Sequence, residues 1–145
     1  MLQKIAESAG KEITYSAVNA ITWQDILAME AAVDSYMVDG MAFVMSPAAR
    51  AALKGIAKGD NTAARFICED NLINGYEVNV SGCVDNDNIY FGGFGELILA
   101  NWGDVEILVD PYTEGRSGAV WVTATALLNA AVTQKHAFAV GKIQG

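Results

Sequence analysis

The sequence predicts an α+β domain, because it contains two helix starts with short apolar or alternating segments between and after them. Thr22 can cap a helix, and Asp25 three residues later completes a capping box. Ser46 followed by Pro47 is a second helix start, since serine caps well and proline suits the first helical position. Mixed helix and strand segments without an internal repeat indicate the α+β class.

The helices should lie in the first half of the chain. From their starts they are expected to span residues 23–38 and 47–57. A shorter helical end is expected over residues 2–9, with Gly10 as its C-terminal cap. Phe43 follows the first long helix in an apolar run, and we expect it in the core beneath that helix.

The strands should follow the apolar and alternating runs. Residues 11–20 have no strong period and are expected to be extended, and Asn74-Gly75 is typical of a turn before an alternating strand. Strands are expected over residues 41–45, 65–68, 76–80, 89–91, 97–100 and 105–109.

The last stretch of the chain fits either of two interpretations. Residues 120–123 are rich in β-branched side chains, whereas the alanine-rich residues that follow tolerate a helix. We favour one long strand over residues 118–132, broken near Asn129, and a final strand over residues 137–140. These strands should pair antiparallel beside the central sheet or project from it.

Composition excludes several classes of protein. The hydrophobic fraction of 52% is too high for a disordered chain, and no apolar run approaches the roughly 18 residues that span a bilayer. A net charge of -8 with scattered basic residues argues against a nucleic-acid reader, and the three tryptophans, Trp23, Trp102 and Trp121, share no spacing that would form a stacking platform. They are expected in core or interface packing.

Cys68 and Cys83 fit a reduced intracellular protein, in which both are expected to be small buried residues. The first residues do not have the pattern of a secretion signal.

Catalytic and metal-binding chemistry has few candidates here. His136 is the only histidine, so a site built on several imidazoles is excluded and a serine or cysteine nucleophile would depend on this one base. We expect a structural or surface role for it. Asp85 and Asp87 could offer oxygen ligands to calcium, but their loop lacks the glutamate that closes a standard calcium site. That loop is expected to be an ordinary turn.

The glycine-rich residues 92–95 are similar to a phosphate-binding loop only superficially. No Lys-Ser or Lys-Thr follows them, and Glu96 would place a negative charge where phosphate must bind. We expect a turn there. The sequence therefore predicts no catalytic, cofactor-binding or metal-binding residue, no cofactor and no enzyme activity.

Six short segments in a fixed order carry a resemblance to a known family. They are residues 22–26 (TWQDI), 42–47 (AFVMSP), 72–78 (LINGYEV), 89–94 (IYFGGF), 109–112 (VDPY) and 136–138 (HAF). In this order they resemble the axial domain of tailed-phage major capsid proteins of the Hong Kong 97 type, over about residues 22–142. Two departures are Glu77, where the family has proline, and Gly93, where it has an acidic residue.

The resemblance implies a domain plan and a function. Residues 1–20 would be a remnant of the spine helix and a connector, residues 21–115 the axial domain, and residues 116–145 closing strands that return toward the peripheral domain. The protein would be a structural subunit that tiles an icosahedral phage or prophage shell around DNA. Its partner would be itself, without sequence-specific DNA binding and without a membrane, in the virion and, before assembly, in the host cytoplasm.

The resemblance also implies what this chain lacks. The family's N-terminal arm, extended loop and most of its spine helix have no counterpart here, so a fragment or truncated copy is expected, monomeric or in small oligomers by itself. Some members form a lysine–asparagine self-crosslink, whose lysine would lie in the missing loop. The counted partner positions here are Gly118 and Thr125, so crosslinking is not implied. Two alternatives stay open: an encapsulin-type shell protein of the same fold, and a small ligand-binding or calcium-binding α+β domain that uses residues 85–95.

Overall fold

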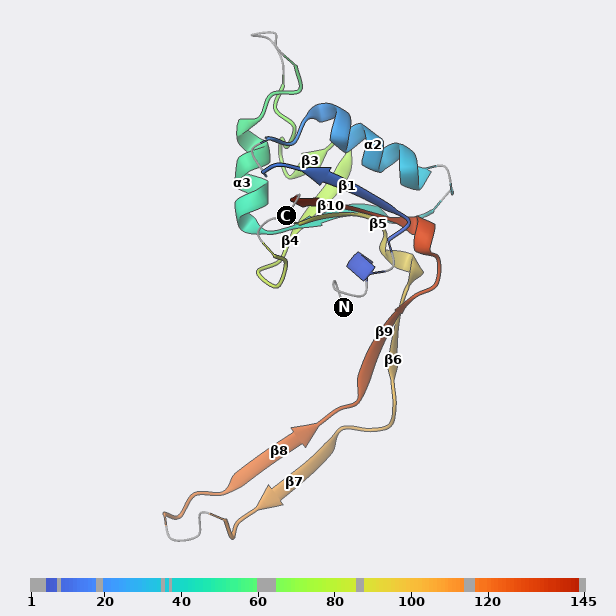
Figure 1. Cartoon of the computed structure of the whole chain (residues 1–145). Coiled ribbons are helices and arrows are strands. Elements are labelled where there is room, and N and C mark those ends of the chain that lie inside the picture. The colour runs from blue at the N-terminus through green and yellow to red at the C-terminus, as the bar shows by residue number, and fades with distance from the viewer. Residues whose placement is uncertain are drawn as a thin grey trace.

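A body built on one six-stranded sheet carries a long β-ribbon that projects from it (Figure 1). These features come from a computed structural model, which describes residues 5–7, 9–17, 20–34, 36, 38–59, 65–85, 88–113 and 117–143. The mixed order of helices and strands confirms the predicted α+β class. Within the described residues, no helix is long and apolar enough to cross a membrane.

In the sheet of the body, a strand near the beginning of the described chain pairs with the strand at its end. Its strands are β1 (Lys11–Tyr15), β2 (Met41–Met45), β3 (Leu72–Ile73), β4 (Tyr76–Val80), β5 (Ile89–Gly93) and β10 (Phe138–Ile143). Their order in space is β1-β10-β5-β2-β4-β3. β1 pairs parallel with β10 and β2 pairs parallel with β4, whereas the other neighbours are antiparallel.

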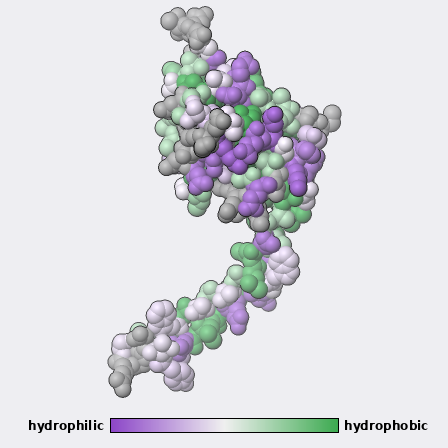
Figure 2. Space-filling model, in the orientation of Figure 1, coloured by the Kyte–Doolittle hydropathy of each residue, from purple (hydrophilic) through white to green (hydrophobic). Residues whose placement is uncertain are grey.

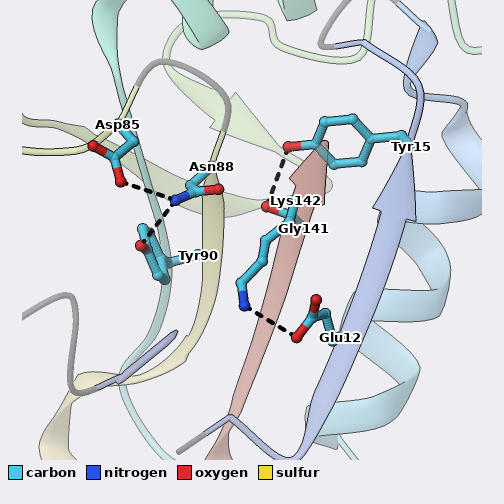
Figure 3. Close-up of polar contacts among 7 residues, drawn as sticks. All are labelled: Glu12, Tyr15, Asp85, Asn88, Tyr90, Gly141 and Lys142. Carbon is cyan, nitrogen blue, oxygen red and sulfur yellow. Dashed lines mark hydrogen bonds and ion pairs between the residues drawn. The ribbon is translucent and has the colours of Figure 1, made fainter. Parts of the chain in front are cut away.

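Side chains reinforce the pairing of β1 with β10. The Tyr15 hydroxyl donates a hydrogen bond to the Gly141 carbonyl oxygen at 3.2 Å (Figure 3). Lys142 Nζ lies 3.0 Å from Glu12 Oε2 across the same two strands. The final strand is therefore part of the body, although the chain leaves the body for the ribbon before it returns.

Both helices begin where the sequence predicts. In α2 (Trp23–Asp34), Thr22 N donates to Asp25 Oδ2 at 2.9 Å, and Asp25 N donates back to Thr22 Oγ1 at 3.3 Å. In α3 (Pro47–Gly55), Ala49 N donates to Ser46 Oγ at 3.0 Å. These short-range hydrogen bonds satisfy backbone donors that have no partner inside the helix.

Both helices end earlier than predicted. α2 stops at Asp34, short of residue 38. Val38 lies outside the helix and is buried in the second apolar cluster, whereas the apolar residues of α2 are buried in the first. α3 stops at Gly55 because the next residues pair with a distant segment: Ile67 N donates to the Ile56 carbonyl oxygen at 2.8 Å. The strand predicted over residues 65–68 is wrong, since only an isolated bridge between Ala57 and Phe66 forms there.

The sheet separates two apolar clusters. On one face, α2 and α3 cover Phe43, which is fully buried as predicted. The other face holds a second cluster that includes Ile5 from the short helical segment 5–7, together with Tyr90 and Val140. Over β2 and β4 this second face is open, with a hollow of about 540 Å³.

Two glycines do not have their predicted roles. Gly10 is not a left-handed C-cap; its N–H donates to Lys135 O at 2.8 Å and Phe138 O at 3.1 Å, and a Cβ there would lie 2.7 Å from His136 Nδ1. Gly92 lies in β5 and not in a turn, where a Cβ would lie 2.3 Å from the Ala137 carbonyl oxygen. Both positions need glycine because another segment passes too close for a side chain. The turn predicted at Asn74-Gly75 is confirmed, with φ of 51° and 90°.

The β-ribbon consists of two antiparallel strand pairs placed end to end. Its strands are β6 (Leu97–Asn101), β7 (Glu106–Asp110), β8 (Trp121–Thr125) and β9 (Leu128–Val132), with β6 paired to β9 and β7 paired to β8. The strand interpretation of the last stretch is confirmed for residues 121–125 and 128–132, whereas residues 118–120 lie in no strand. The break falls at residues 126–127 and not near Asn129. In the structure, the division between body and ribbon falls near residues 96 and 133.

Candidate functional site: the projecting β-ribbon

Most of the large apolar side chains that are exposed in the described part of the chain lie on the β-ribbon. Among the described residues, thirteen of the sixteen exposed large hydrophobic side chains lie between Ile98 and Leu128. Figure 2 shows the corresponding hydrophobic patches along the ribbon, away from the more hydrophilic surface of the body. Exposed apolar surface of this kind is typical of a contact surface, so the ribbon is the candidate functional site.

The outer half of the ribbon has one wholly apolar face. Val109 lies directly opposite Val122, and directly opposed residues on antiparallel strands point to the same side. Ile107 and Ala124 lie two positions away along each strand, so they point to that side as well. We define the distal apolar face by the four residues Ile107, Val109, Val122 and Ala124. The opposite side is mixed, with Glu106, Leu108, Asp110, Trp121, Thr123 and Thr125.

The inner half of the ribbon is partly anchored on the body. Leu97 and Val132 are opposed across β6 and β9, and both pack against the second apolar cluster of the body. Farther out, Leu99 is 65% exposed and Leu128 is 70% exposed. Burial therefore decreases from the root of the ribbon toward its outer half.

A small set of contacts fixes the root of the ribbon. Thr133 Oγ1 lies 2.6 Å from Glu96 Oε2, and Thr133 N donates to the Glu96 carbonyl oxygen at 3.0 Å. Next to them, the rings of Phe94 and Phe138 meet edge to face with centroids 5.6 Å apart. The two crossings between body and ribbon are thus joined to each other, which gives the ribbon a defined direction as it leaves the body.

An aspartate organises the tip of the ribbon. Asp110 Oδ1 accepts hydrogen bonds from the backbone N–H groups of Tyr112 at 2.8 Å and Thr113 at 3.2 Å. The Thr113 hydroxyl donates to the other carboxylate oxygen. This hydroxyl and the two N–H groups hold the pKa of Asp110 below its usual value. Tyr112, which this turn presents, is 88% exposed.

The residues considered for chemistry lie apart from the ribbon faces and from one another. His136 is exposed in the short 3-10 helix Lys135–Ala137 and stacks on Tyr36, with ring centroids 4.7 Å apart. Asp85 is exposed and accepts a hydrogen bond from Asn88 Nδ2 at 3.3 Å, and the same amide lies 3.4 Å from the Tyr90 hydroxyl (Figure 3). Asp87 lies outside the described residues. Among the residues that the structure describes, no three His, Cys, Asp or Glu side chains form a group that could hold a metal ion.

The cysteines and tryptophans divide between body and surface. Cys68 is buried as predicted, and burial raises the pKa of its thiol, whereas Cys83 is exposed, so the prediction for Cys83 is wrong. Trp23 is partly buried against the core, with Lys58 Nζ 4.3 Å from its ring centroid. Trp102 and Trp121 are 62% and 59% exposed on the ribbon. Core packing, one of the two roles expected for the tryptophans, is therefore wrong for Trp102 and Trp121, and an interface role for them stays a prediction.

The sequence predicts strands in the ribbon but not the exposed apolar surface that they form. The available signal was the lack of alternation: residues 97–100 and 107–109 are apolar on both sides of the strand. A strand with two apolar sides must be covered on both, and the body offers no second layer there.

Comparison with known proteins agrees with this architecture. The phage capsid family model matches residues 3–143. The major capsid protein of Halomonas phage phiHAP-1 is 27% identical over 122 residues, which cover 83% of this chain and 20% of that protein. The chain therefore spans about a fifth of the length of this curated relative.

Solved structures show the same fold. The capsid of an empty GTA particle superposes with a TM-score of 0.65 at 22% identity, over 94% of this chain and 47% of that one. A virus-like particle from Pyrococcus furiosus gives a TM-score of 0.67 at 13% identity, over 98% and 60%. Gordonia phage Cozz gives a TM-score of 0.66 at 16% identity, over 97% and 51%.

These likenesses confirm the predicted Hong Kong 97-type fold. Because the family model covers nearly the whole sequence, the chain belongs to the phage capsid family.

Proposed function

We propose that this chain is a structural part of the subunit that builds an icosahedral phage or prophage shell around DNA. The observation that carries the proposal is the exposed apolar β-ribbon on a chain that belongs to the phage capsid family. Because the chain spans only part of its relatives' length, the function of the whole protein is inferred and not read from them.

The physical argument starts from the distal apolar face. Burying apolar surface stabilises a contact by about 25 cal/mol per Å². Three of the four side chains of this face are more than half exposed: Ile107 at 65%, Val109 at 56% and Val122 at 63%. Each ribbon strand also pairs on one side only, and a two-stranded ribbon alone is marginally stable in water. Contact with neighbouring subunits in a shell would cover the face and stabilise the ribbon.

The partner in this proposal is another copy of the same protein. DNA would be enclosed without sequence-specific binding, which the net charge of -8 supports because an acidic surface does not retain phosphate. The protein would have no enzyme activity, and it would pass from the host cytoplasm into the virion. We further propose that the body corresponds to the family's axial domain and the ribbon to part of its peripheral domain.

An enzyme-enclosing shell of the same fold is the second candidate, supported by the likeness to the virus-like particle of Pyrococcus furiosus. A small ligand-binding domain around residues 85–95 has less support. The exposed Asp85 carboxylate there accepts a hydrogen bond from the Asn88 side-chain amide, and Asn88 N donates to the Asp85 carbonyl oxygen at 3.1 Å, as in an ordinary turn.

Analysis of particles tests these alternatives. The natural gene product that contains this chain is produced in its host, and nuclease-resistant particles are sedimented and imaged by electron microscopy. Mass spectrometry should find peptides of residues 97–143 in icosahedral particles, and the particles should hold DNA. An enclosed enzyme without DNA would favour the second candidate. Recovery of the chain only in the supernatant would contradict both shell functions.

A further inference from the structure

A buried carboxylate connects α2 to the hairpin at the edge of the sheet. Glu30 on α2 is only 5% exposed, and its Oε2 accepts a hydrogen bond from Asn74 Nδ2 at 2.6 Å. Its other oxygen, Oε1, is fully buried and makes no hydrogen bond within the described part of the chain. If this carboxyl were ionised, a buried negative charge would be stabilised by only one hydrogen-bond donor, and such burial costs free energy.

The neighbouring charges do not compensate for this burial. Asp34, one turn further along α2, carries the same charge and is engaged with the Tyr76 hydroxyl at 3.4 Å. Lys58, the cation that acts on Glu30, has its ammonium over the Trp23 ring. Burial therefore raises the pKa of Glu30, Asp34 raises it further, and the Asn74 hydrogen bond and Lys58 oppose the rise.

We propose that Glu30 is a proton-operated latch: its neutral carboxyl holds the β3–β4 hairpin against α2, and ionisation loosens that contact. In the neutral form the proton resides on Oε1, and Oε2 still accepts the Asn74 hydrogen bond. In the ionised form the same buried position carries an unpaired charge, and moving the turn away would let water reach it.

The hairpin is a suitable element for such a latch. β3 has two residues, lies at the edge of the sheet and pairs only with β4. Asn74 itself forms the turn between them, in a left-handed conformation with φ of 51°. Beside the turn, Asn74 and Leu72 help line a hollow of about 320 Å³, and Leu72 is 44% exposed. Protonation of Glu30 would thus set the shape of this edge of the body.

The direction of the pH effect follows from the raised pKa. Folding favours the protonated form, so the contribution of Glu30 to stability is complete below its ordinary pKa of 4.5. It is lost as the pH rises from that value through the raised folded-state pKa, and it does not change further above it. Glu30→Gln keeps an oxygen for Asn74 but cannot ionise, so it removes this pH dependence.

Thermal melts of the 145-residue chain from pH 4 to pH 8 test the latch. Glu30→Gln should match the parent near pH 4 and exceed its melting temperature by about 3 °C or more at pH 8. Glu77→Gln, at an exposed position of β4, is the matched control and should follow the parent at every pH. A Glu30→Gln difference that does not change with pH, or a variant less stable than the parent throughout, would overturn the proposal.

A measurement on the parent protein serves if the variant does not fold. The Asn74 side-chain amide and the backbone amides of Leu72 and Ile73 should shift in NMR spectra with the midpoint of the Glu30 carboxyl titration. Amide signals that stay constant while Glu30 titrates would show that ionisation does not move the hairpin, and the latch would be wrong.

Discussion

Phe43 on β2 and Phe91 on β5 lie directly opposite each other in the middle of the sheet, with ring centroids 4.4 Å apart. The Tyr76 ring meets both, at 6.4 Å from Phe43 and 5.1 Å from Phe91. Both phenylalanines are fully buried. Three strands are therefore joined by one aromatic cluster beneath the helices.

Truncation of this cluster should cost much of the stability of the body. We expect Phe43→Ala to lower the free energy of unfolding by about 3–5 kcal/mol, because it removes a buried ring and leaves a cavity. Leu99→Ala, at a 65% exposed position of the ribbon, is the control and should change it by about 0.5 kcal/mol or less. Denaturant unfolding of both variants measures the difference. Equal losses would mean that the core lies elsewhere.

Close approach of two segments at Gly92 gives a second prediction. A Cβ there would lie 2.3 Å from the Ala137 carbonyl oxygen, so Gly92→Ala must displace the backbone that returns from the ribbon. We expect a loss of about 1–3 kcal/mol or more in the free energy of unfolding. Gly82 has no atom within 4 Å of its Cβ position, so Gly82→Ala should be nearly neutral. If the two alanine variants melt alike, the contact between β5 and the start of β10 is not as described.

The Asp85 loop should behave as a turn and not as a calcium site. Asp85→Ala and His136→Ala should each change the free energy of unfolding by about 1 kcal/mol or less. Calcium should leave the melting temperature of the parent unchanged. A calcium-dependent rise in the parent that disappears in Asp85→Ala would contradict this interpretation and revive the ligand-binding alternative.

The parts of the fold that depend on near neighbours in sequence could be predicted. The starts of both helices are set by hydrogen bonds that Thr22 and Ser46 make within three residues, and the turn at Asn74-Gly75 depends on their tolerance of positive φ. The helix ends could not be predicted, because Ile56 leaves the helix to bond with Ile67, which is eleven residues away.

Long-range pairing explains the other differences. Strands over residues 97–100, 105–109 and 118–132 were expected, but nothing local indicates that residue 97 pairs with residue 132 or residue 106 with residue 125. The close contacts that require glycine at positions 10 and 92 involve residues 135–138, which are distant in sequence. These contacts therefore could not be predicted either. The burial of Glu30 could not be predicted either, because its hydrogen-bond partner Asn74 lies 44 residues away in the sequence.

The proposal that the distal apolar face makes shell contacts can be tested by charge substitution on the two sides of the ribbon. A Val109→Asp, Val122→Asp double variant places charges on that face, whereas Thr123→Asp places one on the opposite side of the same ribbon. Neither should unfold the body, which near-ultraviolet circular dichroism of both proteins would check.

Both variants are then introduced into the natural gene, and particles are counted by electron microscopy against the total amount of the protein. We expect Val109→Asp, Val122→Asp to abolish particles at normal protein levels, because a charge buried at a subunit contact costs more than the contact gains. Thr123→Asp should leave most particles intact. Equal particle yields from the two variants would contradict the claim that this face is buried in the shell.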